Sequence, residues 1–326
     1  MPAIVEVNER MCDAIARVLQ NHSIPADIED TSIEGMDAAR ISNFYFLLVA
    51  ICHQTQSLQG IVDGSHHRGW DYLRLKLLSE VVADSVLLEP TTWGKMTPSF
   101  LSSVFNDDQY GETLTDIEGR ASLIRDLGSA LESKGFSSVH DVYLASKGQL
   151  AGESPGLLAR ISKFRAYSDP VQKKSYFFLG LMQNSQSWNY MDEMELGAPV
   201  DYHEVRGHLR LGTVRIGSDL RTILAESRPV SKSEDIAIRT AVRQAITRIA
   251  SLTNQSPMRL HYLFWNVFRN VCLRENPKCF SADRSITIPP RYRHFIERGK
   301  CPFAETCESA GKGSSLIEHS FDTDWY

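Results

Sequence analysis

Apolar residues recur at intervals of three and four positions along most of this chain, whereas strict alternation of apolar and polar residues is scarce. Intervals of three and four place apolar side chains on one face of an α-helix. We therefore expect an all-α fold. The pattern predicts helices over residues 4–19, 41–58, 72–87, 117–131, 175–182, 236–252 and 260–272.

Clusters rich in glycine and proline interrupt this helical pattern and indicate loops. A chain of 326 residues is long enough for two helical subdomains that flank a cleft. The main breaks lie at residues 60–69, 90–98, 148–156 and 183–199. We expect an N-terminal helical subdomain that forms a wall of the cleft (1–150), a catalytic region (151–271), a cysteine loop (272–310) and a flexible acidic tail (311–326).

The composition is that of an ordinary globular protein, with 42% hydrophobic and 23% charged residues. No apolar run approaches the roughly 20 residues that span a bilayer. Acidic residues interrupt the apolar pattern near the N-terminus, which is unlike a signal peptide. We expect a monomeric, intracellular protein without a membrane partner, which is cytoplasmic, or nuclear if the source is eukaryotic.

The net charge of −5 does not favour nucleic acid as a partner, because phosphate binding usually requires a basic surface. Any such binding must therefore be local. Positive charge gathers at Arg206, Arg210, Arg215 and Arg221, and again in the cysteine loop.

Four of the six cysteines lie near the C-terminus in two pairs. Six residues separate Cys272 from Cys279, and five separate Cys301 from Cys307. Thiolates are soft, charged donors, and four of them complete the coordination of a [4Fe–4S] cluster. Zinc is an alternative occupant. Disulfides are a third, although they are typical of exported proteins.

A basic segment separates the two cysteine pairs. It contains Pro289, Pro290, Arg291, Arg293, His294, Arg298 and Lys300. A loop closed by a metal group could press these cations against a phosphate backbone. The alternative is an ordinary solvated loop.

Asp201 follows Pro199 and Val200 and directly precedes a helical pattern, so we expect it to be a helix N-cap. An N-cap aspartate often has only a structural role, stabilising its helix by about 1 kcal/mol. A partly desolvated carboxylate at a helix start can also act as a base or stabilise a developing cation. Cleavage of a glycosidic C–N bond requires these functions.

The sequence Pro-Val-Asp201-Tyr-His203-Glu-Val-Arg206 resembles the Pro-Val-Asp-Thr-His-Val-Phe-Arg signature of the helix-hairpin-helix DNA glycosylases related to endonuclease III and the adenine glycosylases. The resemblance implies that Asp201 is the catalytic carboxylate and that His203 and Arg206 contact the substrate. In that family a loop with the pattern Cys-x6-Cys-x2-Cys-x5-Cys follows and binds a [4Fe–4S] cluster. Here the central gap has 21 residues.

An upstream segment is similar to a second motif of the adenine glycosylases, an apolar helix that ends in Gln-Gln-Thr-Gln. It reads Phe46-Leu-Leu-Val-Ala-Ile-Cys-His53-Gln54-Thr55-Gln56. The resemblance implies that Gln54 probes the gap left by a flipped base, with His53, Thr55 and Gln56 also at the substrate. A polar helix end at the surface is the alternative.

The family's hairpin, Leu-Pro-Gly-Val-Gly-Arg-Lys-Thr, aligns with residues 167–175. This alignment implies that Lys174 is the Schiff-base lysine of bifunctional members, with Lys173 beside it in the DNA-binding hairpin. Such a lysine must be neutral, which requires burial or a cationic neighbour such as Lys173. Both hairpin glycines are absent, and we therefore expect weaker binding of the hairpin backbone to DNA phosphates. Plain surface lysines are the alternative.

The queuosine salvage glycosylases, distant members of the same superfamily, are also similar to this chain. They have an Ala-Asp-Tyr-Arg-Val-Pro segment around their catalytic aspartate and a later Glu-x-Glu-Ile-Arg-Ala helix. Residues 200–203 and 233–241, followed by residues 261–265, are similar to these segments. Those enzymes hydrolyse a modified nucleoside monophosphate and do not need to bind duplex DNA.

Residues 60–150 match no motif of either group, but residues 64–72 contain Trp70 beside histidines and an arginine that could stack on a base or bind its phosphate. The expected function is that of a DNA N-glycosylase of base excision repair, which cleaves the bond to a flipped, modified or mismatched base. AP-lyase activity follows if Lys174 is the nucleophile. The alternatives are a salvage hydrolase for a modified nucleotide and a non-catalytic, zinc-stabilised nucleic-acid-binding module.

Overall fold

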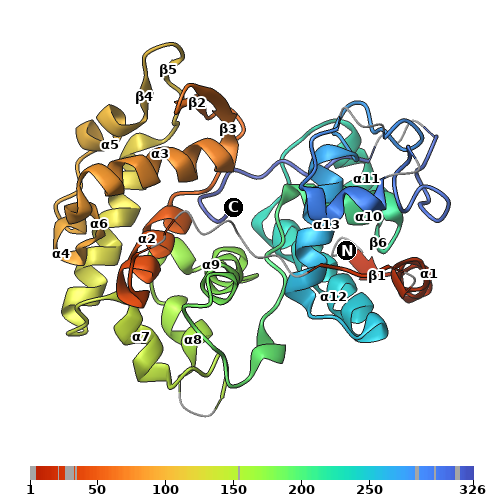
Figure 1. Ribbon diagram of the computed structural model, residues 1–326. Coiled ribbons are helices and arrows are strands. Elements are labelled where there is room, and N and C mark those ends of the chain that lie inside the picture. Colours follow the sequence, from red (N-terminus) through yellow and green to blue (C-terminus); the bar gives the residue numbers. More distant parts are fainter. Residues whose placement is uncertain are drawn as a thin grey trace. The chain divides into compact units, whose positions relative to one another are not determined.

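The computed structural model describes residues 5–20, 22–25, 33, 35–152, 155–282, 286–296, 299–312 and 316–326. The chain forms two compact units (Figure 1). Unit 1 comprises Met1–Asp27 and Leu196–Asp322, and unit 2 comprises Ile28–Glu195 and Thr323–Tyr326. The units therefore do not divide at residue 150 as expected, because the N-terminal segment packs with the C-terminal half of the chain.

Unit 1 is built around the long helix α12. Its elements are β1 (Val5–Val7), α1 (Glu9–Gln20), α10 (Tyr202–Leu211), β6 (Val214–Ile216), α11 (Ser218–Ala225), α12 (Lys232–Thr253), α13 (Pro257–Asn270) and the 3-10 helix η4 (Pro290–Phe295). β1 pairs antiparallel with β6, and α12 packs against α1, α10 and α13. The apolar spacing of α12 explains this position, since Ile238, Val242 and Ile249 are fully buried.

Unit 2 is built around α2, which is buried from Ser42 to its last residue, Ala50. Its elements are α2 (Ala38–Ala50), β2 (Gln59–Val62), β3 (Ser65–Arg68), α3 (Gly69–Ala83), η1 (Ser85–Leu88), α4 (Pro90–Trp93), α5 (Pro98–Phe105), β4 (Asn106–Asp107), β5 (Gly111–Glu112), α6 (Ile117–Ser133), α7 (Val139–Ser146), α8 (Leu157–Ile161), η2 (Arg165–Tyr167), α9 (Lys173–Asn184) and η3 (Glu193–Glu195). Helices α6, α7 and α9 pack on α2. A helix covered on several sides must be apolar all round, as the sequence of α2 is from Phe44 to Ala50.

The chain is predominantly helical, as the apolar spacing predicted, and each of the seven predicted segments contains a helix. The segment predicted to be helical over residues 41–58 stops at Ala50. The break over residues 60–69 contains a β-hairpin, because Asp63 and Gly64 both adopt positive φ and form its two-residue turn. Across the described ranges, no helix is both long and apolar enough to cross a membrane.

Candidate functional site

Asp201 is the N-cap of α10, as the sequence predicted. Its Oδ1 accepts hydrogen bonds from the backbone N–H groups of His203 (2.8 Å) and Glu204 (3.2 Å). Its Oδ2 accepts a hydrogen bond from Nε1 of Trp265, at 2.9 Å. Both oxygens therefore accept hydrogen bonds at the positive end of the helix, an arrangement that favours the ionised carboxylate.

Glu204 completes a capping box with Asp201, since its Oε2 accepts the backbone N–H of Asp201 at 3.4 Å. Its Oε1 lies 2.7 Å from Nδ1 of His261. Glu204 is fully buried, and burial raises the pKa of its carboxyl group although His261 acts to lower it. His261 and Trp265 are one turn apart on α13, so one face of this helix contacts both carboxylates.

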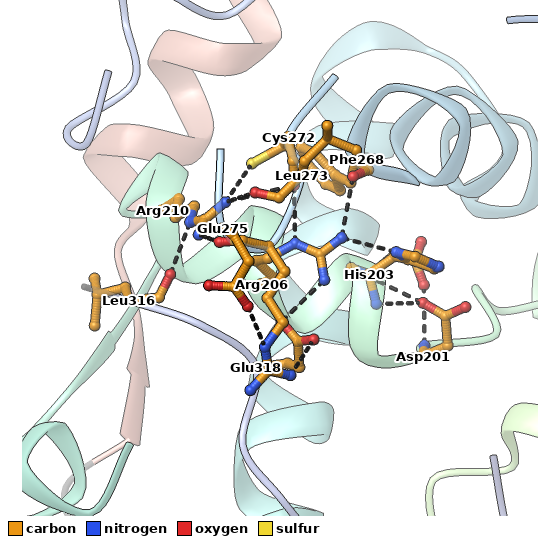
Figure 2. Close-up of polar contacts among 12 residues, drawn as sticks. Asp201, His203, Arg206, Arg210, Phe268, Cys272, Leu273, Glu275, Leu316 and Glu318 are labelled. Atoms are coloured by element: carbon orange, nitrogen blue, oxygen red, sulfur yellow. Dashed lines mark hydrogen bonds and ion pairs between the residues drawn. The ribbon is translucent and has the colours of Figure 1, made fainter. Parts of the chain in front are cut away.

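The Arg206 guanidinium is buried and connects α10 to three other segments of unit 1 (Figure 2). It donates to the carbonyls of Cys272 (2.8 Å) and Phe268 (3.1 Å) and to Glu318 (2.9 Å). One guanidinium nitrogen also lies 2.8 Å from Nδ1 of His203. Burial lowers the pKa of His203 to about 4, so the imidazole is neutral. Because a guanidinium can only donate, Nδ1 is the acceptor of this bond. A DNA contact through Arg206 would require the loss of these bonds.

Arg210, one turn further along α10, reaches the cysteine loop (Figure 2). It donates to the carbonyls of Leu273 (2.7 Å), Arg274 (2.6 Å) and Leu316 (2.7 Å). Its guanidinium also lies 3.4 Å from Sγ of Cys272.

The four C-terminal cysteines line one small cavity, which the C-terminal half of α10 helps to enclose. A backbone hydrogen bond of 2.9 Å from Cys301 to Cys279 joins the two pairs. The segment after Cys307 also covers the end of α10, where the N–H of Ser309 donates to the carbonyl of Arg210 at 3.2 Å. The two pairs therefore line the same cavity although 21 residues separate them in the sequence.

The four thiols that line this cavity are donors of the kind that an iron–sulfur cluster binds. Burial raises the pKa of the Cys301 and Cys307 thiols, that of Cys307 to about 11, so without a bound cation both stay protonated. A metal deprotonates such thiols. Among the described residues, no three His, Cys, Asp or Glu side chains surround one ion position. A cube does not need this arrangement, because each cysteine binds a different iron.

The basic segment between the cysteine pairs contains η4, which has one apolar and one charged side. Tyr292 and Phe295 are buried, whereas Arg291, Arg293 and His294 are exposed. Arg298 lies outside the described residues. Lys300 pairs with Glu305. Of the expected basic run, η4 thus presents three side chains to solvent.

The C-terminal segment of unit 1 does not have the form of the flexible acidic tail that we expected. Glu318 and His319 are buried. Glu318 pairs with Arg206 at 2.9 Å, and Nε2 of His319 lies 2.8 Å from Oδ1 of Asp235 in α12. Burial acts to raise the pKa of Glu318, but the neighbouring guanidinium of Arg206 outweighs it and holds the pKa below its ordinary value. The Gly–Ser residues 313–315 lie outside the described part.

In unit 2, Lys174 is fully buried at the start of α9. Its Nζ donates to the carbonyl of Ala50 at 2.5 Å and lies 3.4 Å from Nδ1 of His53. Burial lowers the pKa of Lys174 to about 7; Cys52 acts against this shift and Lys173 adds to it. A substantial fraction of the amine is therefore neutral at physiological pH, as a Schiff-base lysine requires.

His53 and Arg120 share the C-terminal end of α2 with Lys174. Arg120 is fully buried and donates to the carbonyls of Ile51, His53 (2.7 Å) and Thr115 (2.7 Å). Burial, then Lys174 and Arg120, lower the pKa of His53 well below its ordinary value, so the imidazole is neutral. The Arg120 guanidinium and the Lys174 amine thus both donate to carbonyls at the C-terminal end of α2, and the charge of Arg120 there also stabilises the helix.

Lys173 reaches the same end of α2. Its Nζ lies 3.5 Å from Sγ of Cys52 and 4.9 Å from the centroid of the Phe177 ring. The ring of Trp70 packs edge-on against Phe177, with 4.7 Å between centroids. The two lysines are adjacent on α9, and both contact the end of α2 or the residues that follow it: Lys174 contacts Ala50 and His53, and Lys173 contacts Cys52.

The other residues of the Gln-Thr-Gln motif lie in the turn after α2. Gln54 adopts a positive φ of 46°, and its Nε2 donates to the carbonyl of Thr323 at 3.0 Å. Thr55 is half-buried and Gln56 is exposed. The structure therefore brings His53 to Lys174, whereas Gln54 contacts the last residues of the chain.

The turn before α9 forms without the two hairpin glycines. The Asp169 carboxylate accepts hydrogen bonds from the backbone N–H groups of Val171 and Lys173, both at 2.9 Å. Gln172, which aligns with the second glycine of the hairpin signature, adopts φ +62°. The backbone thus keeps the left-handed conformation that glycine favours, and the side chain of Asp169 stabilises the turn.

Sequence reasoning missed Glu204, Arg120 and the roles of Trp265 and His261. The Asp-x-x-Glu spacing of a capping box could have identified Glu204. Nothing in the sequence marks Arg120, since its contacts depend on the packing of α6 against α2. No family model matches this chain, and no curated protein matches its sequence significantly.

Proposed function

We propose that this protein is an N-glycosylase of the helix-hairpin-helix type, which releases a modified or mismatched base from DNA. The arrangement of α10 is the observation that carries the proposal. Asp201 caps one end of this helix of 10 residues, and the four cysteines line a cavity at its other end. The two most specific motifs of the resemblance are thus joined through one rigid element, about 15 Å long.

The contact between Lys174 and His53 supports the same proposal. These residues come from two motifs that are far apart in the sequence, and their side-chain nitrogens lie 3.4 Å apart. The pKa of Lys174, about 7, suits a nucleophilic amine. In this structure the amine is enclosed and bound to the Ala50 carbonyl, so lyase chemistry would require it to leave that contact.

The proposed chemistry follows from these side chains. As the bond between C1′ and the base nitrogen breaks, its electron pair leaves with the base, which takes up a proton from solvent, and the water that attacks C1′ releases one. Asp201 stabilises the positive charge that develops on the sugar, or accepts a proton from the attacking water. If Lys174 attacks C1′ instead of water, the resulting Schiff base allows strand cleavage. The iron–sulfur cluster, held by Cys272, Cys279, Cys301 and Cys307, would be structural.

DNA binding would be local. Arg291, Arg293 and His294 are exposed on η4 between the cysteine pairs. A cluster in the cavity would fix this segment, and its cations could then contact phosphates although the net charge of the chain is −5.

A second candidate is the hydrolysis of a modified nucleotide, as in queuosine salvage. Trp265 and His261 contact Asp201 and Glu204, at 2.9 Å and 2.7 Å. The contact between Trp265 and Asp201 joins residues 261–265 to residues 200–203, two of the segments that are similar to the salvage enzymes, and Glu204 directly follows the second of these. Such an enzyme needs neither lyase chemistry nor a duplex.

The decisive experiment measures base release from duplexes with damaged or mismatched bases, and from a panel of modified nucleotides, by chromatography with mass detection. Asp201→Asn should abolish release and leave the fold intact, because the amide still caps α10 but carries no charge. Asp219→Asn, at an exposed position in the first turn of α11, is the matched control and should keep full activity.

Each outcome separates the candidates. Release from duplexes supports the DNA glycosylase, release from nucleotides alone supports the salvage hydrolase, and release from neither overturns both. Borohydride trapping of a covalent DNA complex that is lost in Lys174→Gln but kept in Lys173→Gln would identify the nucleophile. Hydrolysis without trapping would make the enzyme monofunctional.

A further inference from the structure

Trp265 contacts the proposed catalytic carboxylate with a group that can only donate. The indole Nε1–H points to Oδ2 of Asp201 at 2.9 Å, while Oδ1 accepts the two backbone N–H groups of the helix cap. The helix cap thus binds Oδ1, and Trp265 donates to the other carboxylate oxygen, Oδ2. An indole cannot accept a proton, so this bond favours an ionised Oδ2.

Trp265 is itself held in place. The guanidinium of Arg269 lies over its ring, 4.7 Å from the centroid, and the His203 ring approaches it edge-on at 6.1 Å. One turn earlier on α13, His261 binds Glu204 at 2.7 Å. These contacts fix the indole relative to α10, and the orientation of its N–H then fixes the plane of the Asp201 carboxylate.

We propose that Trp265 is a positioning residue, which holds Asp201 ionised and in one orientation for the cleavage of the glycosidic bond. This inference rests on the proposed function of Asp201. Trp265 does not react; it lowers the proton affinity of the carboxylate that does. Asp201 would accordingly act as an anion or a base, and not as an acid that protonates the leaving base.

Several other charged or titratable groups interact with Asp201 or with its neighbours in α10, and they remain in a variant that changes only Trp265. They are Tyr202, His203, Glu204 and Arg206 in α10, His261 and Arg269 in α13, and Glu318 in the C-terminal segment. A variant that removes only the indole N–H therefore isolates one donor against a constant electrostatic background.

The test compares Trp265→Phe with the wild-type protein. Phenylalanine keeps an aromatic ring beside Arg269 but has no N–H. Loss of one hydrogen bond to the charged form should raise the pKa of Asp201 by about one pH unit. The acid limb of the pH profile for base release should move upward by the same amount. The ¹³C carboxylate titration of Asp201, assigned by comparison with Asp201→Asn, reports this shift without substrate.

Trp188→Phe is the matched control. Trp188 is also buried, and its indole donates to Nδ1 of His140 at 2.9 Å, but it belongs to unit 2. It should leave the Asp201 titration unchanged. If Trp265→Phe also leaves that titration unchanged, Trp265 does not position Asp201. If the titration shifts while wild-type protein releases no base from any substrate, the positioning role stands and the proposed function fails.

Discussion

The burial of Lys174 predicts a stability that depends on pH in a defined direction. The Lys174 amine has a pKa of about 7 in the folded protein, whereas an unfolded lysine keeps the ordinary value of 10.5. Between these two values the unfolded chain binds more protons than the folded one, so this group makes the protein more stable as pH rises. Lys174→Met removes the titration and keeps a side chain of similar length.

The magnitude follows from linkage. With these two pKa values, the contribution of Lys174 to the free energy of unfolding should rise by about 2 kcal/mol between pH 7 and pH 9. Relative to wild type, Lys174→Met should therefore lose about 2 kcal/mol over the same interval. At pH 7 the free energy of unfolding of Lys174→Met depends on two opposing effects. The variant removes the cost of burying an amine, but it also loses the hydrogen bond to the Ala50 carbonyl.

Urea unfolding followed by circular dichroism, at pH 7, 8 and 9, measures this difference. The matched control is Lys95→Met, because Lys95 is exposed and its ammonium group is hydrated in both states. The control should track wild type at every pH. A difference between Lys174→Met and wild type that stays constant from pH 7 to pH 9 would refute the assignment of a lowered pKa to Lys174.

Three further results are expected. Protein purified without oxygen should be brown and contain about four irons per chain, and Cys272→Ser should remove the colour; a colourless preparation with one zinc per chain would exclude the cluster. Gly207→Ala should lower the free energy of unfolding by about 1–3 kcal/mol in urea titrations, since a Cβ there would lie 2.2 Å from the Phe268 ring; an unchanged midpoint would show that α10 and α13 can separate without cost. Arg293→Ala should reduce the slope of log K against log salt for duplex binding by about one, whereas an equal slope would remove η4 from the DNA interface.

Local patterns in the sequence were sufficient for several features. The spacing of apolar residues predicted the seven main helices, because it depends only on which residues share a face of a helix. Asp201 was predicted as an N-cap from its immediate neighbours, since capping involves backbone groups two and three residues away. The Asp63-Gly64 turn was equally local, but it was missed because its glycine was interpreted only as a break.

The tertiary structure decided what these local elements do together. Whether Lys174 is a surface ammonium or a buried amine depends on the carbonyl of Ala50 and on Arg120, which approach from distant helices. The 21 residues between the cysteine pairs could not be judged from spacing, and only folding shows that all four cysteines line one cavity.

The hydrogen bond between Trp265 and Asp201 is another feature that could not be predicted from the sequence. The sequence alone determined the helices and the N-cap, because their hydrogen bonds join residues that lie within about one helical turn of each other. Desolvation and hydrogen bonds between helices depend on residues that are far apart in the chain, such as Asp201 and Trp265, which are 64 positions apart. The two cysteine pairs line one cavity although 21 residues separate them. Packing sets these distances, so only the tertiary structure decided the protonation of Lys174 and the orientation of Asp201.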